Sequence, residues 1–315
     1  MGDIDRGGVF AALVGTMLLL DPEDQVKGLL INKFRGDPAL LGDAVERLHG
    51  LAFNTPCLGV VPFLPYLTIA EEDAVSFAES ALASVSCEVA VVQLPHIANF
   101  DDFDPLVREP GVRLRCVRHP KQLRNPAAIL LPGTKATLAD LAWLRELGWE
   151  RALIDALASG TQVVGICGGL QMLGTAIRDP EGVEAPAGSS SSGLGLLQVE
   201  TGFSADKQTS QAVLQKDSML IEGYEIHAGE TTRSPQTKPF GRIMRRASDG
   251  VDVADGAVRP DGSVWGTYLH GLFHHDEFRH SWLGELGWLA TEGATLATPD
   301  AEYDRVADAL ETTVG

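Results

Sequence analysis

Apolar residues recur along the chain in short runs separated by mixed segments of helical length, a pattern typical of α/β proteins. In the first third, strands are predicted at 25–32 and 57–62, and helices at 9–20 and 38–49. Because strand and helix alternate, we expect a parallel sheet with covered faces. The segment 9–20 is almost entirely apolar and too short to span a bilayer, so we expect it to be a buried helix.

A second sheet is predicted to begin at residue 88, after a connector rich in small residues at 79–86. The polar segment 179–193, which contains a run of serines, is predicted to be a surface loop. We expect the chain to divide into 1–82, 86–279 and a helical tail at 280–315. Further strands are expected at 88–94, 112–117, 127–131, 162–166, 213–220, 223–230 and 263–269, and helices at 137–147, 170–177 and beyond 278.

One segment combines the features of a nucleophilic site. The predicted strand 162–166 stops at Cys167, turns through Gly168 and Gly169, and continues as a helix. This is the pattern of a nucleophile elbow, in which glycines allow a strained turn and backbone N–H groups converge beside the nucleophile. We interpret Cys167 as the candidate nucleophile. The alternative is a small buried apolar residue at a strand end.

A histidine that is suited to activate this thiol follows another predicted strand. His270 ends a β-rich run and precedes a glycine, so its imidazole is expected at the same sheet edge as Cys167. A free thiol is only slightly ionised at neutral pH, and a neighbouring base makes it a useful nucleophile. The N–H groups of Gly168 and Gly133 are candidates for stabilising an oxyanion. For His270 and Gly133, a structural histidine and an ordinary turn are the alternatives.

The composition narrows the class of protein. The 315 residues exceed the usual size of a single core, and 44% are hydrophobic, so two units are expected. A formal net charge of −18 argues against nucleic acid as a partner. The four cysteines show no paired spacing, which argues against a zinc site or a disulfide framework and favours the reducing cytoplasm. The acidic flank of the segment 9–20 is unlike a secretory signal, and we expect no membrane contact.

Four further histidines stand in two places. His227 follows a predicted strand and is a candidate either for positioning a substrate or for capping a sheet edge. The others lie near Asp276, but they lack the spacing of a helical metal-binding pair. We therefore interpret this second group as a solvated surface segment and assign no metal site to it. Its histidines are His274, His275 and His280.

Three separated groups of motifs stand out along the chain: DIDRGGVF at 3–10 with NKFRGD at 32–37, GICGGLQM at 165–172, and GYEIHAG at 223–229 with GTYLHG at 266–271. Together they resemble the cobyric acid synthase family of glutamine-dependent amidotransferases in cobalamin biosynthesis. The resemblance covers residues 3 to about 279. It implies the C-terminal part of a P-loop-type parallel-sheet synthetase domain at 1–82, followed by a class I glutamine amidotransferase α/β domain at 86–279.

The resemblance implies two reactions. A synthetase domain uses ATP and Mg²⁺ to phosphorylate the b, d, e and g carboxylates of adenosylcobyrinic acid a,c-diamide. Ammonia released from glutamine then displaces each phosphate to give adenosylcobyric acid. On this chain, Cys167 would form the glutamyl thioester, and His270 would act as general base and then acid. Gly133 and Gly168 would supply the oxyanion hole, and Gln171 would help to hold glutamine. No tightly bound cofactor is expected.

One position differs from the wider glutaminase pattern. Many glutaminases carry a glutamate two residues after the catalytic histidine, whereas this chain has Leu272. The cobyric acid synthase family is similar to this chain in lacking that acid, so we do not interpret Leu272 as inactivating. Glu225 is our candidate for the group that orients His270.

The first part of the chain resembles only a portion of a synthetase site. Asp3 and Asp5 resemble its acidic pair, which would reach Mg²⁺ or a corrinoid carboxylate, and Asn32 resembles the residue that contacts adenine. Helix capping by Asp5 and a strand-end turn at Asn32 are the alternatives. The sequence contains no G-x-x-x-x-G-K-[ST] loop. We therefore expect a truncated product, or another polypeptide that supplies the P-loop half, and a chain that hydrolyses glutamine without amidating a corrinoid.

Two other functions stay open at this point. One is a related amidotransferase that acts on a different carboxylate, and the motif at 3–10 argues against it. The other is a degenerate subunit that binds corrinoid or protein partners without turnover. The retention of Cys167, His270 and the elbow glycines argues against this second reading.

Overall fold

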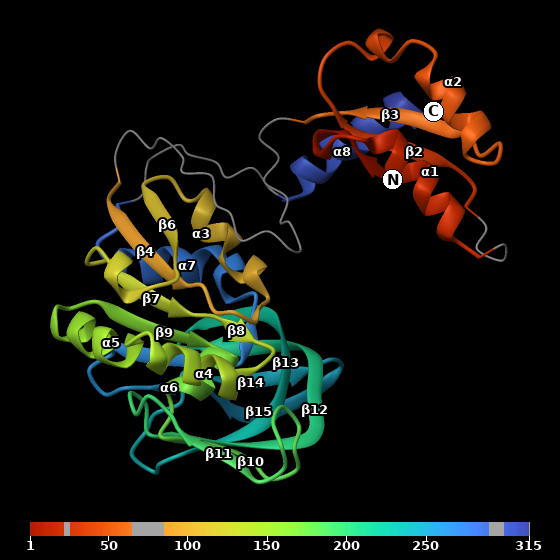
Figure 1. Ribbon diagram of the computed structural model, residues 1–315. Coiled ribbons are helices and arrows are strands. Elements are labelled where there is room, and N and C mark those ends of the chain that lie inside the picture. The colour runs from red at the N-terminus through yellow and green to blue at the C-terminus, as the bar shows by residue number, and fades with distance from the viewer. Residues whose placement is uncertain (22–25, 65–84, 290–298, 315) are drawn as a thin grey trace. The chain divides into compact units, whose positions relative to one another are not determined.

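The chain forms two compact units, which are described separately (Figure 1). The computed structural model describes residues 1–21, 26–64, 85–289 and 299–314. Of these, 85–289 make up unit 2 and the other ranges make up unit 1. The predicted connector at 79–86 lies largely outside the described residues. The tail expected at 280–315 divides between the units, because α7 (Asp276–Glu285) belongs to unit 2 and α8 (Pro299–Val314) to unit 1.

Unit 1 is built on a three-stranded parallel sheet in the order β1-β2-β3. Its small core consists of apolar side chains from α1, β2 and α2, among them Val9, Ile31 and Leu48. The elements before α8 are β1 (Gly2–Asp3), η1 (Ile4–Arg6), α1 (Val9–Leu19), β2 (Leu29–Phe34), η2 (Pro38–Leu41), α2 (Ala44–Leu51) and β3 (Cys57–Pro62).

Two predictions for unit 1 are corrected. The apolar segment 9–20 is helical but only partly buried: Val9 and Leu13 lie in the core, whereas Leu18 and Leu19 are 64% and 88% exposed. The single helix predicted at 38–49 is interrupted by Gly42, which has a φ of +52° between η2 and α2.

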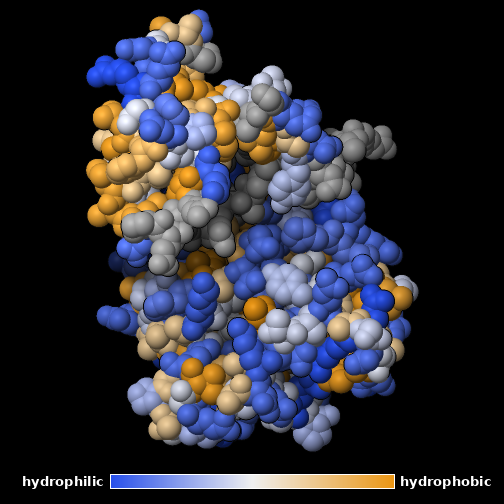
Figure 2. Space-filling view, turned by 90° about the vertical axis from the view of Figure 1, so that its right-hand side faces the viewer, coloured by the Kyte–Doolittle hydropathy of each residue, from blue (hydrophilic) through white to orange (hydrophobic). Residues whose placement is uncertain are grey.

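Figure 2 shows much of the hydrophobic surface on unit 1, in the upper part of that view. No helix among the described residues combines the length and the apolar content needed to cross a lipid bilayer.

Unit 2 is centred on a six-stranded sheet in the order β16-β17-β9-β7-β4-β6, in which only β16 runs antiparallel to its neighbour. Its central strands β4, β7 and β9 are apolar and buried apart from Glu88 and Gln162, as expected for a sheet that is covered on both faces. The strands are β4 (Cys87–Val92), β6 (Val112–Val117), β7 (Ala128–Leu131), β9 (Gln162–Ile166), β16 (Ala257–Val258) and β17 (Val264–Thr267). The helices are α3 (Asp104–Arg108), α4 (Thr137–Glu146), α5 (Trp149–Ala158), α6 (Gly168–Leu173) and α7.

A second, largely antiparallel sheet is dominated by the long hairpin of β12 and β13, which curves along one side of unit 2 (Figure 1). A two-stranded ladder, in which Ala98 lies opposite Gly133, connects two loops at the edge of the first sheet. The second sheet contains β10 (Ala176–Asp179), β11 (Ser189–Ser192), β12 (Val199–Lys216), β13 (Met219–Arg233), β14 (Gly241–Arg246), β15 (Asp249–Asp255) and β18 (Leu269–His270). The short ladder is β5 (Ile97–Ala98) with β8 (Gly133–Thr134).

Most predicted strands of unit 2 are present, and three predictions are corrected. The helix after the elbow ends at Leu173, and Ile177 lies in β10 instead. The segment 179–193 is not all loop, because its serine run forms β11 and pairs with β10. The strand predicted at 213–220 is the turn of the long hairpin, with β12 ending at Lys216 and β13 starting at Met219.

Candidate functional site

Cys167 stands at a strained turn between β9 and α6. Its φ of 51° and ψ of −110° lie outside the regions that a residue with a side chain usually adopts. Its N–H donates to the carbonyl of Thr267 on β17 at 2.8 Å, so the turn is fixed to the sheet. A Cβ on Gly169 would stand 2.0 Å from the carbonyl oxygen of Leu131, so only glycine fits there. The structure therefore has the elbow geometry that the sequence predicted.

His270 is held in place by Asp102, a residue that the sequence analysis missed. The Nδ1 of His270 lies 2.7 Å from one oxygen of Asp102, and the N–H of Gly271 donates to the other oxygen at 2.7 Å. Both side chains are buried. Because Nδ1 donates to the carboxylate, Nε2 is left as the reactive nitrogen, and it has no hydrogen-bond partner among the described residues.

The expectation that Glu225 orients His270 is wrong. The carboxylate of Glu225 accepts two hydrogen bonds from Arg246, at 2.7 and 3.0 Å, and lies 3.7 Å from His227. Leu272 is buried in η5 (Leu272–His274), where it fills apolar space. The acid that orients His270 thus comes from η3 (Phe100–Phe103), after β5. It comes neither from β13, which carries Glu225, nor from the position two residues after the histidine.

Cys167 and His270 meet next to Gly133. A Cβ built on Gly133 would lie 3.3 Å from Cε1 of His270 and 3.7 Å from Cβ of Cys167. Burial lowers the pKa of His270, but the hydrogen bond to Asp102 and the interaction with Cys167 outweigh it and raise the pKa to about 10. The imidazole is therefore protonated at neutral pH. An imidazolium beside a cysteine sulfur is an arrangement that activates the thiol as a nucleophile.

Two residues of β13 complete the surroundings of this pair. The ring of Tyr224 stacks on the ring of His270, with centroids 5.0 Å apart and an interplanar angle of 15°. Its hydroxyl accepts a hydrogen bond from Asn99 at 2.7 Å, and burial raises the pKa of Tyr224 to about 12. The carbonyl oxygen of Ile226 lies 3.5 Å from the Sγ of Cys167. The imidazole is thus confined between an aromatic ring, a carboxylate and the thiol.

Both predicted oxyanion donors lie beside Cys167. Gly168 is the first residue of α6, where backbone N–H groups have no partner within the helix. Gly133 belongs to β8, and a buried aspartate, Asp140, holds its loop. Asp140 accepts a hydrogen bond from the Thr134 hydroxyl at 2.5 Å and lies 2.8 Å from Nδ1 of His96. The fold thus brings two predicted glycines from different loops to the same thiol.

Gln171 is buried one turn into α6 and is already hydrogen-bonded at both ends of its carboxamide. Its Oε1 accepts from the hydroxyl of Thr137 at 3.1 Å, and its Nε2 donates to the hydroxyl of Tyr268 at 3.2 Å. Next to it, the ring of His227 stacks on Tyr268 with centroids 3.9 Å apart. The Nδ1 of His227 lies 3.0 Å from the carbonyl of Gly229, so this histidine is fixed by its own loop. The contacts of both side chains are therefore structural in this state.

The candidate residues of unit 1 stand at the C-terminal ends of β1 and β2. Asp3 accepts from the N–H of Asp5 and lies 3.2 Å from Nζ of Lys33, so Asp3, and not Asp5, caps the first helical turn. Asp5 forms a two-point ion pair with Arg35, whose hydrogen bond lowers the pKa of Asp5. Asn32 accepts from the N–H of Lys33 at 2.9 Å. Each carboxylate of the pair is therefore matched by a cation of the same unit.

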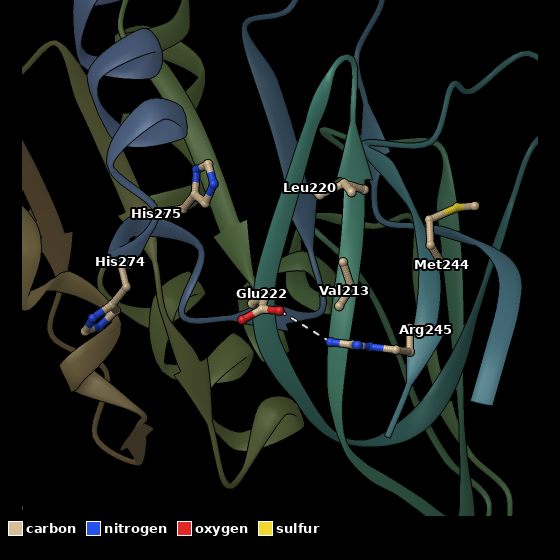
Figure 3. A pocket seen from close by; sticks show the side chains of 7 residues that line it. All are labelled: Val213, Leu220, Glu222, Met244, Arg245, His274 and His275. Atoms are coloured by element: carbon tan, nitrogen blue, oxygen red, sulfur yellow. Dashed lines mark hydrogen bonds and ion pairs between the residues drawn. The ribbon is translucent and has the colours of Figure 1, made fainter. Parts of the chain in front are cut away.

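The histidines after His270 do not form one cluster. His275 accepts from the N–H of Phe278 and caps α7, whereas His280 lies 2.8 Å from Glu109. His274 and His275 line a hollow of about 640 Å³ on the far side of which Glu222 pairs with Arg245 at 3.3 Å (Figure 3). Cys167 and His270 do not line this hollow. A neighbouring hollow of about 610 Å³ is lined by Tyr224 and Ile226, the two residues of β13 that contact His270 and Cys167.

Comparison with known proteins assigns this site to a family. The model of one family, described as the CobB/CobQ-like glutamine amidotransferase domain, matches residues 88–278. The chain belongs to this family. The matched range contains Cys167, His270 and Asp102, and it lies within unit 2.

Curated relatives extend the likeness beyond the amidotransferase domain. The cobyric acid synthases of Chloroflexus aggregans and Roseiflexus castenholzii are each 47% identical to this chain and match all of it, over 65% and 64% of their own length. That of Rhodobacter capsulatus is 44% identical, over 99% of this chain and 64% of its own. The chain thus spans about 65% of the length of these relatives. A solved structure described as a glutamine amidotransferase has a TM-score of 0.48 and 20% identity, covering 63% of this chain and 98% of that chain.

Proposed function

We propose that unit 2 hydrolyses glutamine to glutamate and ammonia, with Cys167 as the nucleophile and His270 as the acid and base. The observation that carries this proposal is the meeting of the strained Cys167 turn with a histidine whose Nδ1 is fixed by Asp102. Membership of the CobB/CobQ-like glutamine amidotransferase family supports it. Asp102 acts as a positioning residue, because its carboxylate is hydrogen-bonded to His270 and to the backbone N–H that follows it.

In the proposed reaction, the sulfur of Cys167 attacks the carboxamide carbon of glutamine, and the imidazolium of His270 donates its proton to the leaving nitrogen. The C–N bond breaks, ammonia departs and a glutamyl thioester remains. His270, now neutral, takes a proton from water, whose oxygen attacks the thioester and releases glutamate and the thiolate. The N–H groups of Gly133 and Gly168 stabilise the oxyanion in both steps. Gln171 keeps this pocket in shape and has one further amide hydrogen to offer to glutamine.

For the whole protein, we propose that the ammonia amidates the b, d, e and g side-chain carboxylates of adenosylcobyrinic acid a,c-diamide to give adenosylcobyric acid. Relatives that are 42–47% identical to this chain carry the name cobyric acid synthase, which supports this substrate. ATP would supply the phosphate that activates each carboxylate, and Mg²⁺ would accompany it.

The residues of unit 1 fit a bound Mg²⁺ poorly as they are arranged. Carboxylates are the ligands that Mg²⁺ prefers, and Asp3, Asp5 and Asn32 stand at one sheet edge. However, Lys33 and Arg35 already neutralise the two aspartates. We keep these three residues as candidates for binding ATP, Mg²⁺ or the corrinoid, and we derive no reaction step from them.

The proposal is tested by glutamate release from L-glutamine with the full chain and its Cys167→Ser and His270→Ala variants. We expect both variants to lose activity by several orders of magnitude. A glutamine-analogue electrophile such as 6-diazo-5-oxo-L-norleucine should modify Cys167, which mass spectrometry of the digested chain would detect. Hydrolysis at the wild-type rate by Cys167→Ser, or labelling of another cysteine instead, would refute it. Corrinoid binding by the chain separates a cobyric acid synthase from an amidotransferase for another carboxylate, because this chain alone is not expected to amidate a corrinoid.

A further inference from the structure

The loop between β10 and β11 is built around one buried carboxylate. Asp179, at the end of β10, has no exposed surface. Its two oxygens accept backbone hydrogen bonds at 2.8–2.9 Å from four successive N–H groups. Backbone bonds to a buried anion fix the turn, so the positions of the loop side chains are set by the fold. The donors are Gly182, Val183, Glu184 and Ala185.

This loop places the carboxylate of Glu184 at the first residue of α4, next to the residues that surround the Cys167 turn. One oxygen of Glu184 accepts from the N–H of Thr137 at 2.7 Å, and the other lies 3.1 Å from the Thr137 hydroxyl, whose single proton it shares with Gln171. The same hydroxyl lies 3.1 Å from Oε1 of Gln171 and 3.5 Å from the point where a Cβ of Gly168 would stand. Glu184 is therefore separated from the backbone beside the nucleophile by one side chain only.

Glu184 brings a negative charge without a matching cation. Burial raises the pKa of Glu184, and the hydrogen bonds from Thr137 oppose that effect without cancelling it. In the described part of unit 2, the charged group that influences Glu184 is another anion, Asp179. A half-buried carboxylate that lacks a counter-ion favours the binding of a positively charged group.

We propose that Glu184 binds the α-ammonium group of the glutamine substrate and so selects L-glutamine over amides that lack this group. The inference rests on the proposed glutaminase function. With the carboxamide carbon at Cys167, the α-nitrogen of an extended glutamine lies roughly 5 Å away, four bonds along the chain. The hydroxyl of Thr137 stands 3.5 Å from the Cβ position of Gly168 and 3.1 Å from Glu184, so a ligand that extends from Cys167 past Gly168 approaches Glu184 over a comparable length. The ammonium group would supply the missing cation.

A purely structural role for Glu184 leads to a different expectation. Its bonds to the first turn of α4 cap that helix, which by itself would stabilise the fold and leave substrate preference unchanged. Glu184→Gln separates the two roles, because a glutamine side chain still accepts a hydrogen bond from Thr137 but carries no charge. Glu181→Gln is the matched control: it lies in the same loop, is exposed, and accepts from the N–H of Ala205, away from Thr137.

The experiment compares kcat/KM for L-glutamine with that for glutaramate, the same amide without the α-ammonium group. Loss of a charged hydrogen bond should lower kcat/KM of Glu184→Gln for L-glutamine by about ten- to a hundred-fold, mainly through KM. The value for glutaramate should hardly change, so the preference for L-glutamine collapses. Glu181→Gln should behave as wild type, and the thermal midpoints of both variants should stay close to that of wild type.

The outcomes distinguish this inference from the proposed function. If Glu184→Gln keeps the wild-type preference for L-glutamine, Glu184 does not bind the ammonium group, although the glutaminase proposal stands. If the wild-type chain shows no hydrolysis that depends on Cys167, the glutaminase proposal fails, and calorimetric binding of L-glutamine to the Cys167→Ala chain decides the inference. Binding that Glu184→Gln weakens supports it. The absence of binding, or binding that the substitution leaves unchanged, overturns it.

Discussion

Replacing Asp102 with asparagine removes one charge from a buried pair while keeping its shape. Asp102 receives two donors, Nδ1–H of His270 and the N–H of Gly271, each at 2.7 Å. An asparagine has only one oxygen, so either orientation of its amide leaves one of these buried donors facing an NH₂ group. The lost bond and the unpaired donor should cost about 1–3 kcal/mol of unfolding free energy. The fold should therefore survive Asp102→Asn.

The effect on activity should be much larger than the effect on stability. Without the carboxylate, His270 loses the main cause that raises its pKa to about 10, while burial still lowers it. The imidazole should then be neutral at pH 8, with its proton free to sit on the wrong nitrogen. In Ser-His-Asp enzymes the corresponding change lowers kcat on the order of 10⁴-fold, and we expect about 10²- to 10⁴-fold for glutamate release here.

The pH dependence gives a second, independent readout. The folded pKa of His270 is raised from 6.5 to about 10, so the stability that its pairing contributes is present below about pH 6.5 and is lost as the pH rises towards 10. Urea titrations should show this decline in the wild type and not in Asp102→Asn. The alkaline limb of kcat should also move from about pH 10 towards 6.5 or below. Asp101→Asn, an exposed neighbour, is the control. A wild-type kcat and pH profile in Asp102→Asn would refute the reasoning.

Two glycine substitutions test the geometry around the thiol. Gly133→Val should lower kcat/KM for glutamine at least ten-fold, because the new Cβ would stand 3.3 Å from Cε1 of His270 and its methyl groups would fill the substrate space. Unchanged glutaminase kinetics would contradict this. Gly169→Ala should lower the free energy of unfolding in urea by about 3 kcal/mol, or prevent folding, because its Cβ would overlap the carbonyl of Leu131. A variant as stable as wild type would show that the turn can relax. Gly284→Ala, whose Cβ meets no other atom within 4 Å, is the control for both.

The local part of this site was predictable because its signals are short-range. The elbow needs only the order of β9, Cys167 and two glycines, and these stand next to each other in the sequence. His270 was found from a strand end followed by glycine. Asp102 was missed because it is 168 residues from His270 in sequence, and the two are brought together only by packing of the loops at one edge of the sheet. The local signal was a pair of acidic residues after a short strand, which by itself fits any exposed loop.

The serine run in β11 shows a different limit. Polar composition predicted a loop, but ladder hydrogen bonds are made by the backbone, so serine can pair as well as an apolar residue at an edge. Arg145 of α4 also binds the carbonyl of Gly193 at 2.9 Å and the hydroxyl of Ser191 at 3.0 Å. These contacts depend on tertiary structure. The composition-based argument for segment 179–193 therefore predicted a loop but missed β11 and the buried Asp179, which hold Glu184 in place.

The packing of α8 against β3 has a consequence for how this polypeptide is made. Unit 1 takes α8 from residues that follow unit 2 in the sequence, so this helix is synthesised after unit 2. On the ribosome, the amidotransferase unit can therefore reach its native state while the first sheet still waits for its final helix. A released chain that ends before residue 299 should accordingly show protease resistance in unit 2 and cleavage within residues 1–64.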